Sequence, residues 1–268
     1  MLPKMQRLPA KFSRLGRVCS AVISLLMGSL FWAPADESAS FTNLVAQGEA
    51  LGLKGDVPGA LKIYSTADAL VLNNSAELCI LTKHYCDLMY DTTAPDLRKT
   101  LAQTALDCAR RALKADTNNP SAHLCVAVGY VKNFPYIDNE TKMKWSKAIK
   151  AECETAIKLD PKQDISYYLL GRWNYNIATL NFIYKGLARL IYGGFPTASI
   201  DDAIANFKKA IELAPNRVIH HHELAIAYIA TGQKKLAMAE LEKCATLQPV
   251  DRDDVQAQKD AATLLTSL

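Results

Sequence analysis

The chain has 268 residues, of which half are apolar and 22% are charged, which excludes a mostly disordered protein. Its net charge of +4 arises at the N-terminus, because residues 1–35 hold five of the 31 basic residues and none of the 27 acidic ones. The remainder has 26 basic and 27 acidic residues. A nearly neutral body is not that of an electrostatic nucleic-acid binder, so we expect no nucleic acid among the partners.

The first 35 residues have the order of a targeting segment. A basic stretch precedes an apolar run from Val18 to Trp32, and Ala33-Pro34-Ala35 follows before the first acidic residues. The run is as long as the core of a signal peptide and short for a membrane span. We expect residues 1–35 to be a signal peptide or signal anchor, residues 36–268 to be the folded domain, and the protein to be secreted or periplasmic. A basic leader without acids is also typical of mitochondrial import, so a mitochondrial or membrane-anchored protein is the alternative.

A 34-residue repeat follows. Its small, large, small and helix-ending positions occur twice at this offset, as Ala203, Phe207, Ala210 and Pro215, then Ala237, Leu241, Cys244 and Pro249. Less regular copies stand upstream, at Ala60, Tyr64 and Ala67, at Ala105, Ala109 and Ala112, and at Ile149, Cys153 and Ala156. Small residues at these positions pack one helix of a hairpin on the other, and proline ends the helix. The period is that of tetratricopeptide repeats, so we predict an all-α, tetratricopeptide-like helical-hairpin solenoid of about five units.

Two stretches exceed the period, and we expect them to be insertions near residues 133–145 and 177–196. The first surplus is ten residues and the second is twenty. Apolar residues of the second recur at helical spacing until Gly193-Gly194, and Ser199 is placed to cap the next helix. The second insertion is therefore an expected helix, which either packs on the array or offers a contact to lipid or protein.

The C-terminal segment 253–268 has the apolar residues of a capping helix, which a solenoid needs at its end. No catalytic motif, phosphate loop or Cys-x-x-Cys pair stands in the chain, so we expect no enzyme, no cofactor and no metal site. The run His220-His221-His222 cannot converge on one ion, because successive helical residues point about 100° apart. The body cysteines are expected to be buried thiols, with a disulfide as the alternative.

The string from Tyr168 to Trp173, Tyr-Leu-Leu-Gly-Arg-Trp, is followed by the apolar insertion, by Phe195-Pro-Thr-Ala-Ser199 and by the helix-like stretch 203–213. This arrangement resembles the regulator of microtubule dynamics family over roughly residues 45–265. The resemblance implies a tetratricopeptide-like fold and an association with microtubules, spindle poles and mitochondria, with one branch tethering organelle membranes.

Solenoids of this type bind peptides or helices on the concave face, which the first helix of each unit lines. The positions expected to bind a partner are Lys132, Tyr168, Arg172, Tyr175, Asn176 and His222. Arg172 suits a carboxylate or a peptide backbone, or else it pairs with an internal acid.

The predicted function is a non-enzymatic scaffold that binds a protein or peptide segment in the concave groove. The alternatives are a microtubule- or organelle-membrane-associated regulator, as the resemblance implies, and a lipid-binding carrier with the inserted helix as a lid. Membrane contact is expected only through the leader or the inserted helix. The sequence predicts no oligomeric state.

Overall fold

The computed structural model describes the backbone of residues 33–268 and the side chains of residues 40–268. Within that part of the chain there are twelve α-helices, one short 3-10 helix and no strand, which confirms the all-α prediction. The predicted leader lies outside the described residues except for its last three, which begin the first described helix.

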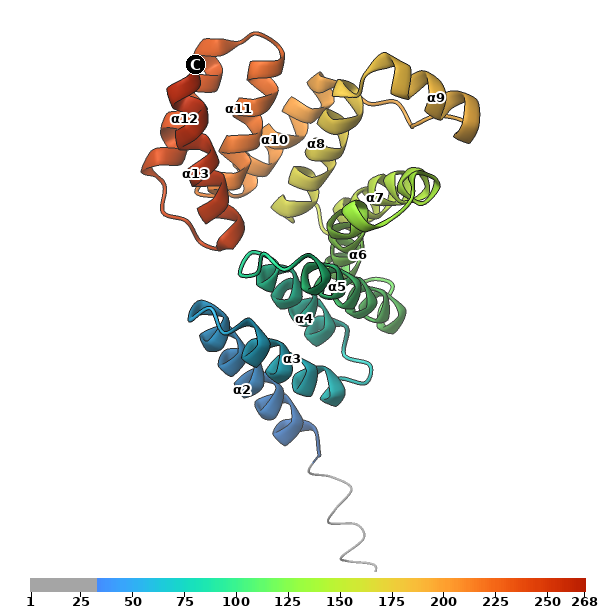
Figure 1. Ribbon diagram of the computed structural model, residues 1–268, viewed down its shortest axis with the longest axis vertical. Helices are drawn as coiled ribbons and strands as arrows, with labels where there is room; N and C mark the ends of the chain where they lie inside the picture. Colours follow the sequence, from blue (N-terminus) through green and yellow to red (C-terminus); the bar gives the residue numbers. More distant parts are fainter. Residues whose placement is uncertain (1–32) are drawn as a thin grey trace, which may run out of the picture.

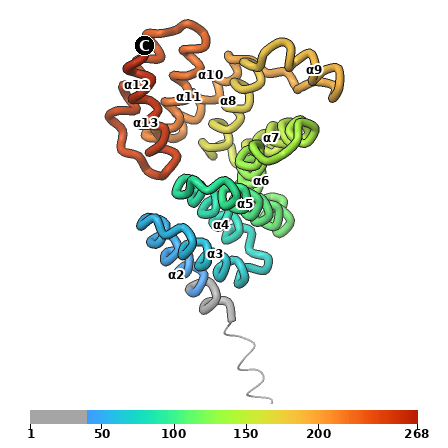
Figure 2. The backbone as a smooth tube through the Cα atoms, viewed as in Figure 1, coloured from blue at the N-terminus to red at the C-terminus, as the bar shows by residue number. Residues whose placement is uncertain are grey.

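Ten of these helices form five antiparallel hairpins that stack in chain order (Figure 1). The pairs are α2 (Ala33–Leu53) with α3 (Val57–Leu70), α4 (Ser75–Leu88) with α5 (Pro95–Ala115), α6 (Pro120–Asn133) with α7 (Asn139–Leu159), α8 (Asp164–Thr179) with α10 (Ile200–Leu213), and α11 (Val218–Ala230) with α12 (Lys234–Thr246). The tube in Figure 2 follows them from α2 at the bottom to the C-terminal hairpin at the top.

In the first and fourth hairpins, a glycine beneath an aromatic ring allows the two helices of the hairpin to approach closely. A Cβ added to Gly48 would lie 2.3 Å from the ring of Tyr64, and one added to Gly171 would lie 2.6 Å from the ring of Phe207. The two partners are 16 residues apart in the first unit and 36 apart in the fourth. The twenty-residue surplus therefore lies between the two helices of the fourth unit.

This surplus forms α9 (Phe182–Tyr192) and its flanking segments, which confirms the inserted helix. The helix ends at Gly193 in the left-handed region, with φ of 76°, and the amide of Gly194 donates to the carbonyl of Ala188 at 3.0 Å. The Ser199 hydroxyl accepts from the amide of Asp202 at 3.0 Å and caps α10, as expected. In Figure 1, α9 projects at the upper right edge, away from the stacked hairpins.

The same histidine–glutamate contact occurs in the third and fifth hairpins, and its spacing locates the ten-residue surplus. His123 on α6 contacts Glu152 on α7, and His221 on α11 contacts Glu240 on α12; the second nitrogen of each ring faces a carbonyl in the preceding turn. The pairs are 29 and 19 residues apart in sequence. The extra ten residues therefore lie between α6 and the middle of α7, in the 3-10 turn Phe134–Tyr136 and the first turns of α7.

The last helix, α13 (Arg252–Ser267), packs on α11 and α12 through Ala257 and Ala261, as a cap should.

The six cysteines of the described residues are free: Cys86, Cys108, Cys153 and Cys244 are buried, and Cys79 and Cys125 are half-buried. The buried apolar residues form two clusters, one in the first two units and one in the last three with the cap. Val128 on α6 packs against both, so the solenoid is continuous across the boundary.

The glycine at position 171 should be essential to the packing of the fourth unit. We expect Gly171→Ala to lower the free energy of unfolding by about 1–3 kcal/mol, because the added methyl group overlaps the Phe207 ring. Gly186→Ala is the matched control in the same unit, since its Cβ meets nothing within 4 Å and alanine favours a helix. Thermal unfolding followed by circular dichroism measures both, and equal stability of the two variants would contradict the packing described.

Candidate functional site

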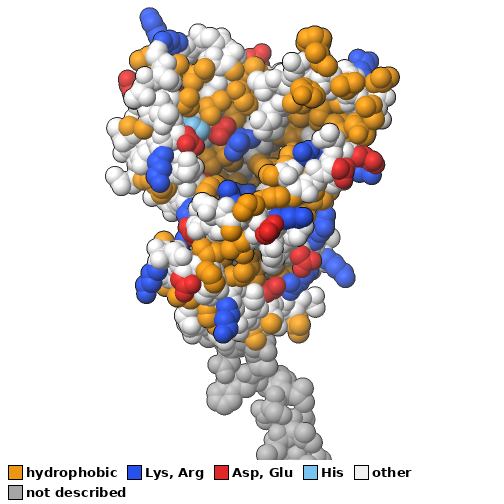
Figure 3. All heavy atoms as spheres, viewed as in Figure 1, with side chains coloured by type: hydrophobic (Ala, Val, Ile, Leu, Met, Phe, Trp, Pro, Cys, Tyr) orange, Lys and Arg blue, Asp and Glu red, His pale blue; other side chains and the backbone are white. Residues whose placement is uncertain are grey.

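The concave face holds one groove made of two adjoining hollows, of about 230 and 500 Å³. Helices α4, α6 and α8 form one side, and the start of α13 with the residues before α11 forms the other. Val128, Lys132, Ile165 and Asp253 line both hollows, which makes them continuous. Figure 3 shows a depression with orange and blue side chains between the upper and lower halves of the molecule.

The groove is closed at one end by a contact between the start of α13 and the end of α4. The hydroxyl of Tyr90 donates to the carboxylate of Asp253, and the guanidinium of Arg252 contacts the carboxylate of Asp91. Arg252 also donates to the carbonyl of Asp87 at 3.1 Å. Residues more than 160 positions apart in sequence thus meet across the axis of the solenoid.

Lys132 extends this contact into the groove. Its Nζ lies 3.3 Å from the Tyr90 hydroxyl and 4.6 Å from the centre of the Tyr90 ring. Burial and the neighbouring Asp253 carboxylate hold the pKa of the Tyr90 phenol well above its ordinary value, so the phenol stays a donor at neutral pH. Lys132, Tyr90 and Asp253 therefore form one hydrogen-bonded chain across the groove.

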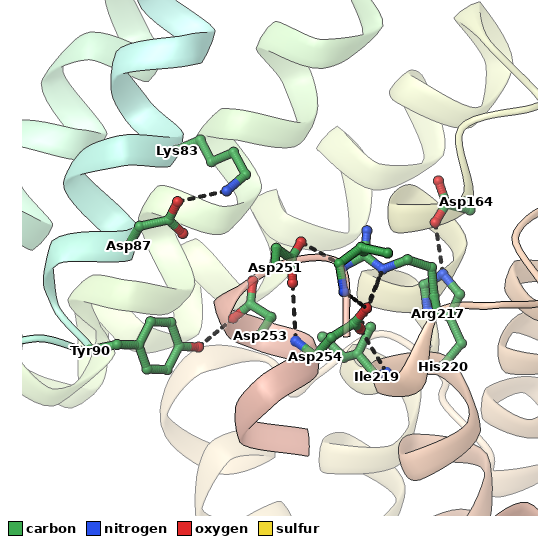
Figure 4. Close-up of polar contacts among 11 residues, drawn as sticks. Lys83, Asp87, Tyr90, Asp164, Arg217, Ile219, His220, Asp251, Asp253 and Asp254 are labelled. Atoms are coloured by element: carbon green, nitrogen blue, oxygen red, sulfur yellow. Dashed lines mark hydrogen bonds and ion pairs between the residues drawn. The ribbon is translucent and has the colours of Figure 1, made fainter. Parts of the chain in front are cut away.

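Arg217 fixes the opposite wall (Figure 4). Its guanidinium lies 2.8 Å from Asp251 and 3.2 Å from the fully buried carboxylate of Asp254. Asp254 also accepts from the amide of Ile219 at 3.0 Å. These bonds place the start of α13 against α11 and hold Asp253 at the edge of the groove.

Arg172 lies in the smaller hollow and pairs with an internal acid. Its guanidinium is 3.2 Å from the Tyr168 hydroxyl and 3.5 Å from the carboxylate of Glu223. The side chain of Glu223 is 9% exposed and that of Arg172 is 44% exposed. Burial raises the pKa of Glu223, although the charge of Arg172 acts in the opposite direction. Arg172 thus neutralises a buried carboxylate and still presents part of its surface to the groove.

Four of the six predicted binding residues lie together. Lys132, Tyr168, Arg172 and Asn176 all line the smaller hollow. Tyr175 and His222 line neither hollow: Tyr175 is half-buried against the C-terminal core, and His222 is buried on α11. Whether any of the six binds a partner stays a prediction.

Sequence reasoning missed the residues that close the groove, which are Tyr90, Arg217, Asp251 and Asp253. Tyr90 follows the end of α4, Arg217 and Asp251 precede α11 and α13, and Asp253 lies in the first turn of α13, all outside the first-helix positions that were expected to line the groove. The only sequence signal was the expected capping helix, which did not indicate that its first residues return to the second unit.

The three adjacent histidines point in different directions. The Nε2 of His220 is 2.7 Å from Asp164 on α8, and the Nδ1 of His221 is 2.6 Å from Glu240 on α12. Burial lowers the pKa of His222, whose Nε2 has no hydrogen-bond partner within the described residues. His220 and His221 therefore tie α11 to its neighbours. Among the side chains that the structure describes, residues 40–268, no group of three possible ligands is placed to hold a metal.

Comparison with known proteins settles the family. The family model described as "Regulator of microtubule dynamics protein 1-3" matches residues 44–268. The chain belongs to the regulator of microtubule dynamics family. Regulator of microtubule dynamics protein 2 of Homo sapiens is 30% identical over 187 residues, which are 69% of this chain and 45% of that protein. Protein 1 of Mus musculus is 31% identical over 179 residues, 66% of this chain and 58% of that protein.

This family member spans about half the length of the curated relatives it matches. Solved structures confirm its fold: a thermophilic TPR protein of Thermus thermophilus has a TM-score of 0.58 at 17% identity, covering 83% of this chain and 99% of that one. PilF of Pseudomonas aeruginosa has a TM-score of 0.52 at 12% identity, covering 86% of each chain. Among the helices described, none is both long and apolar enough to cross a bilayer.

The Arg172–Glu223 pair predicts a specific dependence of stability on pH. The raised pKa of Glu223 means that the folded state holds a proton which the unfolded state releases, so this contribution to stability declines as pH rises above the ordinary carboxyl value. Arg172→Leu removes the charge that lowers this pKa and leaves the carboxylate unpaired. We expect its melting temperature to be close to that of the native chain at pH 4 and several degrees lower at pH 7.

The double variant Arg172→Leu with Glu223→Gln serves as the control, because it has no carboxylate to ionise at this position. The difference in melting temperature between this double variant and the native chain should be the same at both pH values. If Arg172→Leu lowers the melting temperature equally at pH 4 and pH 7, the stabilising effect of Arg172 does not come from its ion pair with Glu223.

Proposed function

We propose that this protein is a non-enzymatic scaffold that binds a short extended segment of a partner protein in the groove between α6, α8 and the start of α13. The observation that carries the proposal is the placement of two basic side chains, Lys132 and Arg172, in a hollow with mostly apolar walls. Such a site combines burial of an apolar anchor with a charge that fixes its register.

The chemistry of the hollow indicates the kind of segment. Val128, Ile165 and Ile219 provide an apolar wall, which suits an aliphatic or aromatic side chain. An ammonium group has three donors, and a single described hydrogen bond, to Tyr90, uses one donor of Lys132. Lys132 can therefore bind a backbone carbonyl or a carboxylate next to the apolar anchor. We infer a partner segment that carries an apolar residue beside an acidic residue or a chain end.

A substitution that fills the hollow should abolish this binding. Val131 lines the smaller hollow and is 37% exposed, so Val131→Arg places a long side chain in the groove without disturbing the core. We expect peptides selected by the native chain from a displayed random library to lose at least tenfold in affinity, about 1.4 kcal/mol, for Val131→Arg. Fluorescence anisotropy of the labelled peptides provides the measurement.

Leu236→Arg is the matched control, because Leu236 on α12 has comparable exposure and lies outside both hollows. It should bind the selected peptides as the native chain does. Selection of no peptides, or of peptides that bind both arginine variants equally, would overturn the proposal.

Membership of the family supports a second candidate, a regulator associated with microtubules or organelle membranes. The names of the matched relatives point to microtubules, and the near-neutral body favours recognition through the groove over attraction by net charge. Sedimentation with polymerised tubulin tests this role, and binding that survives Val131→Arg would place the contact outside the groove. The compartment bears on it too: a native chain beginning at Asp36 in an exported fraction would remove tubulin from its surroundings.

The lipid-carrier alternative makes the inserted helix a lid over an apolar cavity. No residue of α9 lines either hollow of the groove. Lys185 and Arg189 of α9 line a separate hollow together with Phe195. Mass spectrometry of the purified protein for bound lipid remains the test of that alternative.

A further inference from the structure

Helix α9 exposes an apolar face. Ile183, Leu187, Leu190 and Ile191 stand at the spacing of one helical face, and all four are exposed. Ala188 is the one residue of α9 that is buried. Figure 3 shows this face as a patch of apolar side chains at the upper right, over the position of α9 in Figure 1.

The helix is held in this orientation by lysines at both ends. The Nζ of Lys185 donates to the carbonyl of Ala178 in the last turn of α8, at 2.7 Å. The Nζ of Lys147 on α7 donates to the carbonyl of Tyr192 at the end of α9, at 3.3 Å. The fold therefore fixes α9 with its apolar face outward, and does not leave it as a loose segment that could fold back.

The charges carried by α9 itself have one sign. Between Asp164 and Asp201 there is no acidic residue, while Lys185 and Arg189 lie on α9 itself and Lys147 lies at its end. An amphipathic helix whose own charges are all basic is the pattern of a helix that lies in the interface of an anionic membrane. The long side chains of lysine and arginine can keep their charges among the headgroups while the apolar face enters the acyl region.

The size of the face argues against a second copy of the chain as its partner. Eleven residues make a helix about 16 Å long and about 10 Å wide, which offers only a few hundred Å² on one side. A stable protein interface buries about 800 Å² on each partner. Insertion into a bilayer surface has no such requirement, because each apolar side chain gains by transfer on its own.

We propose that α9 is a membrane-docking helix, which inserts its apolar face into the surface of a bilayer that contains anionic lipid. The helix lies on the surface and does not span it. The docking is independent of the leader and of the groove.

Local insertion at α9 can be measured in the full chain, whatever the leader does. Leu190 on α9 and Leu72, between α3 and α4, are 83% and 82% exposed, so each can become tryptophan without loss of packing. Each variant is mixed with vesicles of phosphatidylcholine and phosphatidylserine whose acyl chains carry bromine. We expect the added fluorescence of Leu190→Trp to be quenched and that of Leu72→Trp to be unaffected.

Charge is tested with Arg189→Gln in the Leu190→Trp background. Its partition into the anionic vesicles should weaken about fivefold, since a basic residue near an anionic surface contributes about 1 kcal/mol. The native partition should fall on vesicles of phosphatidylcholine alone, and equal partition there would overturn the anionic assignment.

Three further results would overturn the docking proposal. The first is absence of quenching at position 190 while the protein binds the vesicles, which would assign binding to another segment. The second is equal quenching at positions 190 and 72. The third is a change in the fluorescence of Leu190→Trp with protein concentration in the absence of vesicles, which would assign the face to a second copy.

Discussion

The contact between the start of α13 and the end of α4 determines what the concave face can be. Without it the five hairpins would form an open array whose groove has one wall. With it, Tyr90, Asp253 and Arg252 join the second unit to the cap and give the groove a second wall. The contact is polar and partly shielded from water, so its donors and acceptors must be satisfied by one another. The Arg217–Asp254 ion pair supports this contact, because it fixes the orientation of α13 relative to α11.

The repeat and its interruptions could be predicted from the sequence because they depend on local size and spacing. Alanine, glycine and aromatic residues at fixed offsets determine how two neighbouring helices approach, and neighbours in the solenoid are neighbours in sequence. The positions of Tyr168, Arg172 and Asn176 followed from the same argument, since residues four apart share one face of α8. Tyr175 lies at the edge of that face and packs against the core. Helical periodicity alone does not distinguish such an edge position from one that lines the groove.

The closure and the orientation of α9 could not be predicted in this way. Tyr90 and Asp253 are 163 residues apart, and no local pattern links them. The apolar stripe of α9 is compatible both with core packing and with an exposed face, because helical periodicity says which residues share a side and not what covers that side. The exposure of the apolar side chains shows that this side turns outward, and the links from Lys185 and Lys147 to backbone carbonyls hold it there. One helix relates the two proposed surfaces: α8 lines the groove with Arg172 and ends at the segment that leads into α9.

Small-angle X-ray scattering of the purified chain tests the closed groove most directly. If the groove is closed, the native chain scatters as a compact particle. Arg252→Glu then enlarges the radius of gyration and leaves the helical circular dichroism unchanged, because a carboxylate at this position repels Asp91 and separates α13 from α4. A native profile typical of an open, extended array, or a radius of gyration that Arg252→Glu does not change, would contradict it.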